Sequence, residues 1–79
     1  MSVRVLFFGA TANITGTRQI EVELPDTVKA QQIFDQLLAN FPELAAHRLL
    51  FSVNQQYASG SEPLSDGDEL AIFTAVSGG

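Results

Sequence analysis

Residues 28–41, VKAQQIFDQLLANF, carry their apolar side chains at helical spacing. The apolar positions follow the i, i+3, i+4, i+7, i+8 and i+11 pattern of one helix face, and they are Ala30, Ile33, Phe34, Leu37, Leu38 and Phe41. This spacing predicts an amphipathic helix of about three turns. Asp26 or Thr27 is expected to cap its start. Asn40 and Pro42 are expected to end it, because the residue before a proline avoids helical backbone angles.

Short strand-like segments flank this helix on both sides. Residues 3–8 are rich in β-branched and aromatic side chains, and residues 18–24 alternate between apolar and polar. Together they predict a hairpin whose strands are joined by a loop over residues 9–17. The segments after the helix are predicted, in chain order, as a helical turn (43–48), a strand (49–53), a turn (54–56), a strand stub (57–58), a turn (63–69) and a last strand (70–76).

The predicted element order, β-β-α-β-(β)-β, indicates a two-layer α+β roll. The whole chain, residues 1–79, has room for one domain and one core. A single main helix covers only one face of a sheet. The other face must therefore meet solvent or a partner.

Strand parity predicts which side chains lie on that uncovered face. If Val5 and Phe7 point at the helix, their neighbours point away, because successive side chains of a strand alternate between faces. The same reasoning applied to the last strand and to the stub beside it gives an exposed apolar surface of Leu6, Phe8, Tyr57 and Phe73. One outward apolar residue is ordinary, but such a cluster is typical of a protein interface.

Composition excludes several classes of function. The chain has no cysteine, and nine Asp and Glu outnumber four Lys and Arg, for a formal net charge of −5. Disulfides, thiolate metal sites and iron–sulfur clusters are thereby excluded, and the excess of acid disfavours nucleic acid as a partner. The apolar run over residues 5–8 is far shorter than the roughly 20 residues of a membrane helix, and no signal-peptide cleavage pattern follows it. A cytoplasmic protein with no membrane partner is expected.

The remaining motifs offer little chemistry. His47 is the one histidine and has no partner at metal or catalytic spacing. Asp66, Asp68 and Glu69 miss the spacing of a calcium loop and are read as a solvated turn. The glycines of the 9–16 segment lack the lysine of a phosphate-binding loop. No metal or cofactor site and no catalytic set is predicted, so the domain is expected not to be an enzyme by itself.

The last residues, Val76, Ser77, Gly78 and Gly79, follow the last predicted strand directly. Glycines have no Cβ atom, so a diglycine tail can enter a narrow channel. The terminal carboxylate is ionised and a poor electrophile, so an outside enzyme must activate it, most simply with ATP as an acyl-adenylate. A folded body with an apolar docking face and a flexible tail over about 76–79 predicts a carrier. The alternative is a frayed end or cloning remnant without function.

Residues 63–79, PLSDGDELAIFTAVSGG, resemble the ending of the small sulfur-carrying subunits of molybdopterin synthases. Residues 3–9 and 53–55 also fit that family, and the resemblance covers essentially the whole chain. It implies a ubiquitin-like β-grasp fold with a mixed four- to five-stranded sheet. Many members have two prolines where this chain has Thr74 and Ala75, so a more flexible tail or a longer last strand is expected here.

The resemblance also implies a reaction sequence. An ATP-dependent adenylyltransferase would adenylate Gly79, and a sulfur donor protein would convert it to a thiocarboxylate. The tail, with Gly78 in the channel, would then enter the large subunit and give sulfur to cyclic pyranopterin monophosphate, within a heterotetramer. Phe8, Tyr57 and Phe73 fall where the family presents its partner-facing patch. No cofactor would be bound stably, and the catalytic groups would belong to the large subunit.

Two alternatives keep a β-grasp fold. The first retains the chemistry in another pathway, either as a sulfur carrier for thiamine thiazole synthesis or as a protein-modifying ubiquitin-like protein. The second is an inert β-grasp interaction module whose diglycine does nothing. A β-grasp electron carrier is excluded because the chain has no cysteine to hold a cluster.

Overall fold

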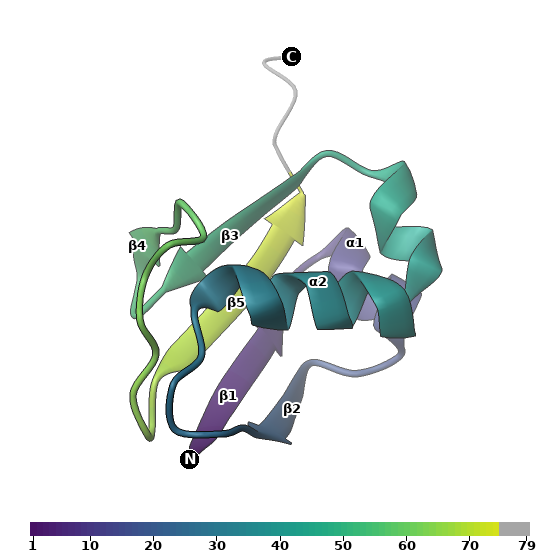
Figure 1. The fold of residues 1–79 in the computed structure, drawn as a ribbon. Helices are drawn as coiled ribbons and strands as arrows, with labels where there is room; N and C mark the ends of the chain where they lie inside the picture. The colour runs from purple at the N-terminus through teal and green to yellow at the C-terminus, as the bar shows by residue number, and fades with distance from the viewer. Residues whose placement is uncertain (75–79) are drawn as a thin grey trace.

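The computed structural model describes residues 1–74, which form one five-stranded sheet with helices packed on it (Figure 1). The elements are β1 (Ser2–Phe7), α1 (Ala10–Thr15), β2 (Gln19–Glu23), α2 (Ala30–Asn40), the 3-10 helix η1 (Pro42–Ala46), β3 (Leu49–Val53), β4 (Gln56–Tyr57) and β5 (Glu69–Thr74). No helix in this part of the chain combines the length and the apolar character needed to cross a membrane.

The sheet is mixed, in the order β2-β1-β5-β3-β4. The central strand β1 pairs antiparallel with β2 and parallel with β5, and β5 pairs antiparallel with β3. Because β1 and β5 run the same way, Phe7 and Thr74 lie toward the same end of the sheet (Figure 1). The predicted hairpin and the predicted α+β roll are confirmed.

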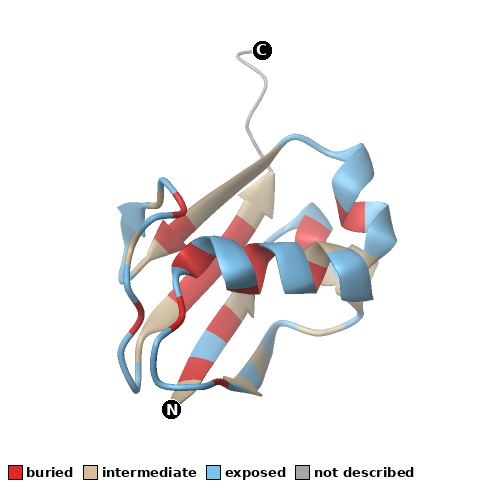
Figure 2. Cartoon of the chain, viewed as in Figure 1, coloured by how far each residue is buried: buried red, intermediate tan, exposed pale blue. Residues whose placement is uncertain are grey.

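The core lies between the sheet and α2, which covers one sheet face (Figures 1 and 2). Burial alternates along β1 as strand parity predicts, and Phe34 of α2 stacks on Phe51 of β3 with ring centroids 4.0 Å apart. The buried side chains that build this core from the two layers are Val3, Val5, Phe7, Leu70 and Ile72 of the sheet and Ala30, Ile33, Phe34 and Leu37 of α2. The predicted helical stripe therefore faces the core with Phe41 at its edge, except for Leu38, which is half-buried and lies outside the core cluster.

Residues 9–17 are not the loop that was predicted, because they contain helix α1. The helix is six residues long, which is too short to show a hydrophobic period. It ends at Gly16, whose left-handed backbone (φ 76°) lets its N–H donate to the carbonyl of Ala12 at 2.9 Å. Thr11 is fully buried and holds the helix against the sheet.

The start of α2 also differs from the prediction. The helix begins at Ala30 with Lys29 in the capping position, so neither Asp26 nor Thr27 caps it. The N–H groups of Ala30 and of the next residue donate to carbonyl oxygens of the 60–62 loop, each at 2.9 Å. Backbone groups far along the chain thus satisfy the first turn, and this contact left no local signal in the sequence.

The turn between β3 and β4 offers a stability test. Its two central residues, Asn54 and Gln55, both have positive φ (50° and 69°), which is the geometry of a tight hairpin turn. Asparagine tolerates this region, but glutamine does so at a cost of about 1–2 kcal/mol. We expect Gln55→Gly to stabilise the fold by up to about 1 kcal/mol, net of the extra chain entropy of glycine. Urea unfolding should show a higher midpoint.

The matched control for that substitution is one residue further along. Gln56 lies in β4, in a strand conformation that glycine only weakens. Gln56→Gly should therefore lower the unfolding midpoint. A stabilising effect at residue 56, or a destabilising one at residue 55, would contradict the assignment of strain to the turn.

Candidate functional site

The sheet face opposite α2 carries several apolar side chains on neighbouring strands. Strand pairing places Leu6 of β1 beside Ala71 of β5, Ala71 beside Ser52 of β3, and Ser52 beside Tyr57 of β4. All of these side chains have the parity opposite to the core residues. This row therefore lies on the side of the sheet opposite α2, which we call the outer face. Tyr57 is exposed there and Leu6 half-buried, whereas Ala71 and Ser52 are buried, each with 8% exposure.

Exposure on the outer face supports the predicted surface. Tyr57 is 76% exposed and Phe8, which directly follows β1, is 51% exposed. Leu6 and Phe73 are half-buried, and the rings of Tyr57 and Phe73 lie 6.2 Å apart. The structure thus brings Tyr57 and Phe73 together and places Leu6 and Phe8 along β1. Their role as a partner interface stays a prediction.

Sequence reasoning missed one member of this surface. Leu50 of β3 lies directly opposite Phe73 of β5 and is half-buried. The alternation of β3 would have revealed it, because Phe51 and Leu50 must face opposite sides of the sheet. Continuous apolar character over residues 49–51 hides that alternation from inspection of the sequence alone.

Thr11 fixes the end of β1 relative to β5. Its hydroxyl oxygen accepts the Phe8 N–H at 3.0 Å, and the hydroxyl lies 2.8 Å from each of the carbonyl oxygens of Phe8 and Ile72, to which it can donate. The side chain is fully buried, so no water can replace these contacts. Thr11 therefore sets where Phe8 is presented and how β5 approaches the end of the sheet.

We expect Thr11→Val, which keeps the shape and removes the hydroxyl, to destabilise the fold by about 1–3 kcal/mol. For a domain of this size each kcal/mol lowers the melting temperature by roughly 4–8 °C. Thr17→Val is the matched control, because the Thr17 hydroxyl donates to the Gln19 carbonyl (3.0 Å) at an exposed position where water can substitute. Thermal melting should separate the two, and equal shifts would contradict the proposed anchoring by Thr11.

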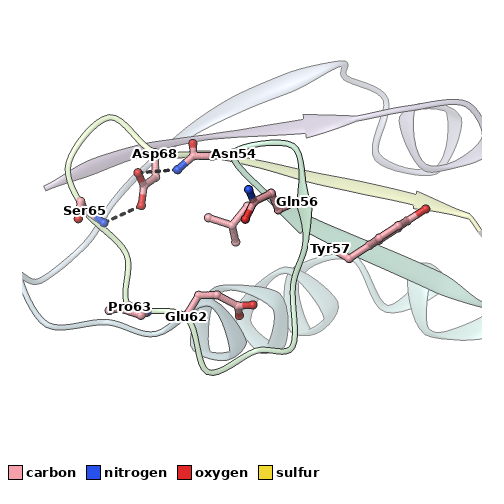
Figure 3. Close-up of a pocket in the computed structure, with 8 residues that line it drawn as sticks. Asn54, Gln56, Tyr57, Glu62, Pro63, Ser65 and Asp68 are labelled. Atoms are coloured by element: carbon pink, nitrogen blue, oxygen red, sulfur yellow. Dashed lines mark hydrogen bonds between the residues drawn. The ribbon is translucent and has the colours of Figure 1, made fainter.

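A polar cavity of about 440 Å³ lies where the β3–β4 turn meets the loop before β5 (Figure 3). Asp68 occupies its wall, accepting the side-chain N–H of Asn54 at 3.0 Å and the backbone N–H of Ser65 at 2.7 Å. In Figure 3 the ring of Tyr57 projects away from this pair. The bonds tie two loops together, and they occupy both oxygens of the Asp68 carboxylate.

The neighbouring acids are engaged in the same way. Asp66 accepts the backbone N–H of Ser2 at 2.8 Å, and Glu69 lies 3.8 Å from the Arg4 guanidinium. Within residues 1–74 no group of three histidine, aspartate or glutamate side chains is arranged to hold a metal ion. The acidic turn at 66–69 is thus a brace between β1, β3 and β5.

Glu62 closes its own loop in a comparable arrangement. Its carboxylate accepts the backbone N–H of Ser59 at 2.7 Å and that of Gly60 at 2.8 Å. These bonds, led by the one from Ser59, hold the pKa of the Glu62 carboxyl below its usual range. The ionised side chain keeps in place the loop whose carbonyl groups meet the first turn of α2.

The remaining candidate residues are His47, at the end of η1, and the last four residues of the chain. His47 is exposed at the end of η1, where its backbone N–H donates to the Leu44 carbonyl at 3.1 Å. Val76, Ser77, Gly78 and Gly79 lie outside the described residues, as does the predicted continuation of the last strand beyond Thr74.

Residues 5–79 match the family model described as the ThiS family. The chain belongs to the ThiS family. A relative from Homo sapiens named molybdopterin synthase sulfur carrier subunit is 34% identical over 82 residues, which cover 98% of this chain and 93% of the relative. The resemblance stated from the sequence is therefore confirmed.

Solved structures support the fold of this ThiS family member. SAMP1 from Haloferax volcanii, a small archaeal modifier protein, has a TM-score of 0.85 and 26% identity, with all of both chains covered. A complex of subunits 1 and 2 of the molybdopterin-converting factor from Helicobacter pylori contains a chain with a TM-score of 0.71 and 23% identity, again over the full length of both. The predicted ubiquitin-like β-grasp fold is confirmed.

Proposed function

We propose that this chain is the sulfur-carrier subunit of a molybdopterin synthase. The observation that carries the proposal is similarity over nearly the whole chain to relatives of that name. The outer face adds independent support, because a small domain that exposes Phe8 and Tyr57 beside Leu6 and Phe73 offers a docking surface. The chain is not an enzyme by itself in this proposal.

The chemistry follows from the terminal carboxylate of Gly79. One of its oxygens attacks the α-phosphorus of ATP in an adenylyltransferase and expels pyrophosphate, which makes the acyl carbon electrophilic. Hydrosulfide supplied by a donor protein then attacks the acyl carbon and displaces AMP, which leaves a thiocarboxylate. In the large subunit this nucleophilic sulfur attacks a carbon of cyclic pyranopterin monophosphate and displaces an oxygen from it, which joins carrier and substrate through an acyl–sulfur bond. Hydrolysis of that bond leaves the sulfur on the substrate and returns the carboxylate of the carrier for another round.

The partners divide the work. The large subunit supplies the catalytic groups and forms a heterotetramer with two copies of this chain, and the adenylyltransferase and sulfur donor act before it in the cytoplasm. The folded domain of the carrier docks on the partner and positions the C-terminal carboxyl group. Because the reacting atom is placed by a docked body, its effective concentration at the site greatly exceeds that of a free acid.

Mass spectrometry of the chain after incubation with the adenylyltransferase, ATP and a sulfur donor tests the proposal. We expect a mass gain equal to the exchange of one oxygen for sulfur, localised to Gly79. The loaded chain should then yield molybdopterin with the large subunit and restore molybdoenzyme activity in cells lacking the carrier. No gain in mass would favour an inert module, and rescue of thiamine synthesis alone would assign the other carrier pathway.

A protein-modifying role is the second candidate, favoured by the 26% identity with SAMP1. The same activated carboxyl would then form an amide with a lysine of a target protein. Cells expressing a tagged chain should in that case contain covalent conjugates with a Gly79–lysine linkage. Their absence, with thiocarboxylate present, would restrict the chain to sulfur transfer.

A further inference from the structure

A second hollow lies at the end of the sheet, beside the outer face. It has a volume of about 480 Å³ and is lined by Phe7, Phe8, Gly9, Ala12, Asn13 and Arg18. Phe8 belongs both to this hollow and to the apolar surface, so the two are continuous. Neither the acidic turn at 66–69 nor the cavity of Figure 3 shares these residues.

The hollow presents hydrogen-bond donors without a carboxylate to receive them. Arg18 and Asn13 are both exposed, and no acidic side chain is among the lining residues. Among residues 1–74 the ion pairs join the N-terminal ammonium to Asp26 and Arg4 to Glu69, and neither involves Arg18. A guanidinium has donors in a fixed fork that matches a carboxylate.

Charge is unevenly distributed along β1. The start of the strand is surrounded by acidic residues, because Asp66 binds the backbone N–H of Ser2 and Asp26 lies 3.8 Å from the N-terminal ammonium. At the other end, the backbone N–H of Phe7 donates to the carbonyl of Arg18 at 2.8 Å. The cation therefore lies at the end of the sheet toward which β5 also runs, in a chain of net charge −5.

We propose that this hollow receives a carboxylate side chain of the partner protein that docks on the outer face, with Arg18 as its ion-pair partner and Asn13 as a further donor. The proposal rests on the proposed function, since it adds a polar contact to that docking. A lone exposed guanidinium binds a free anion only weakly. A carboxylate on a protein that already covers Phe8 is partly desolvated and held in place. The same ion pair therefore contributes more to the binding free energy.

An ion pair at the edge of an apolar interface acts on recognition. Steering by opposite charges raises the association rate and makes it sensitive to salt, while a like charge at the same place rejects the wrong partner. Arg18 is thus a specificity-determining residue of the carrier. Arg18 would touch the partner rather than the reacting atoms, so its substitution should act on the affinity for that partner.

The test is calorimetric titration of the full chain with the cognate large subunit of molybdopterin synthase at low and at physiological salt. We expect Arg18→Glu to weaken binding by roughly 10- to 100-fold and to flatten its salt dependence, with Arg18→Gln in between. Replacing the matching acidic residue of the large subunit by lysine should restore binding to Arg18→Glu. Unchanged melting temperatures show that the variants fold.

Arg48→Glu is the matched control. Arg48 is exposed and precedes Leu49, which pairs with Thr74 at the same end of the sheet, but it does not line the hollow. The same change of charge there should cost less than about 3-fold if only long-range steering is involved. Equal losses at both arginines, or no loss at Arg18, would overturn the inference and leave the proposed function intact. Failure of the wild-type chain to bind the large subunit would overturn both.

Discussion

A chain that lacks Gly79 is expected to acquire no sulfur and to support no molybdopterin formation. Deletion leaves a carboxylate on Gly78, but it shortens the reach of the acyl carbon by about 3.3–3.6 Å. A displacement of only about 1 Å can cost a reaction roughly 100-fold, so a whole residue should bring turnover below detection. The measurement is the oxygen-to-sulfur mass gain together with molybdopterin yield from the large subunit.

Two controls separate the effect of tail length from the effect of the amino-acid composition of the tail. Ser77→Ala keeps the tail length and should retain most of the activity, whereas one extra glycine after Gly79 should fail as the deletion does. All three chains should have the melting temperature of the wild type, because the core is built from residues between Val3 and Ile72. Molybdoenzyme activity in cells that express only the deleted chain would contradict the assignment of Gly79 as the sulfur-bearing residue.

Elements with a clear hydrophobic period could be predicted from the sequence almost to the residue. Strand β2 differs by one residue at each end from the predicted 18–24, α2 ends where Pro42 requires, and the parity of β1 separates the core from the outer face. Each of these signals is local, since it depends on whether neighbouring side chains meet the core or solvent. The outer face could also be predicted, because one main helix can cover only one of the two faces of a sheet.

Features that depend on contacts across the chain could not be predicted in this way. Helix α1 is held by the Thr11 hydroxyl near the carbonyl of Ile72, 61 residues away, and the first turn of α2 is satisfied by the 60–62 loop. The hollow beside Phe8 likewise needs the β1–α1 turn and Arg18 to meet. A single-sequence pattern contains no record of such pairings.

Phe73→Asp should abolish productive docking while leaving a folded carrier. Phe73 lies near the end of β5, the middle strand of the sheet, opposite Leu50 and 6.2 Å from the ring of Tyr57. An aromatic anchor in such a position commonly accounts for 2 kcal/mol or more of binding, about 30-fold. A carboxylate there would also be buried without a partner on docking, so we expect a loss of at least about 100-fold in affinity for the large subunit.

The matched control places the same charge on the other side of the molecule. Gln36 is exposed and belongs to α2. Because α2 covers the opposite sheet face (Figure 1), Gln36→Asp should bind as the wild type does. Because Phe73 is half-buried, Phe8→Ala serves as a second variant with little at stake in folding, and it should weaken binding by roughly 10- to 30-fold. If folded Phe73→Asp and Phe8→Ala both bind like the wild type, the partner does not dock on the outer face. Parallel loss in all three variants would instead indicate a general effect of charge or stability, which melting curves would identify.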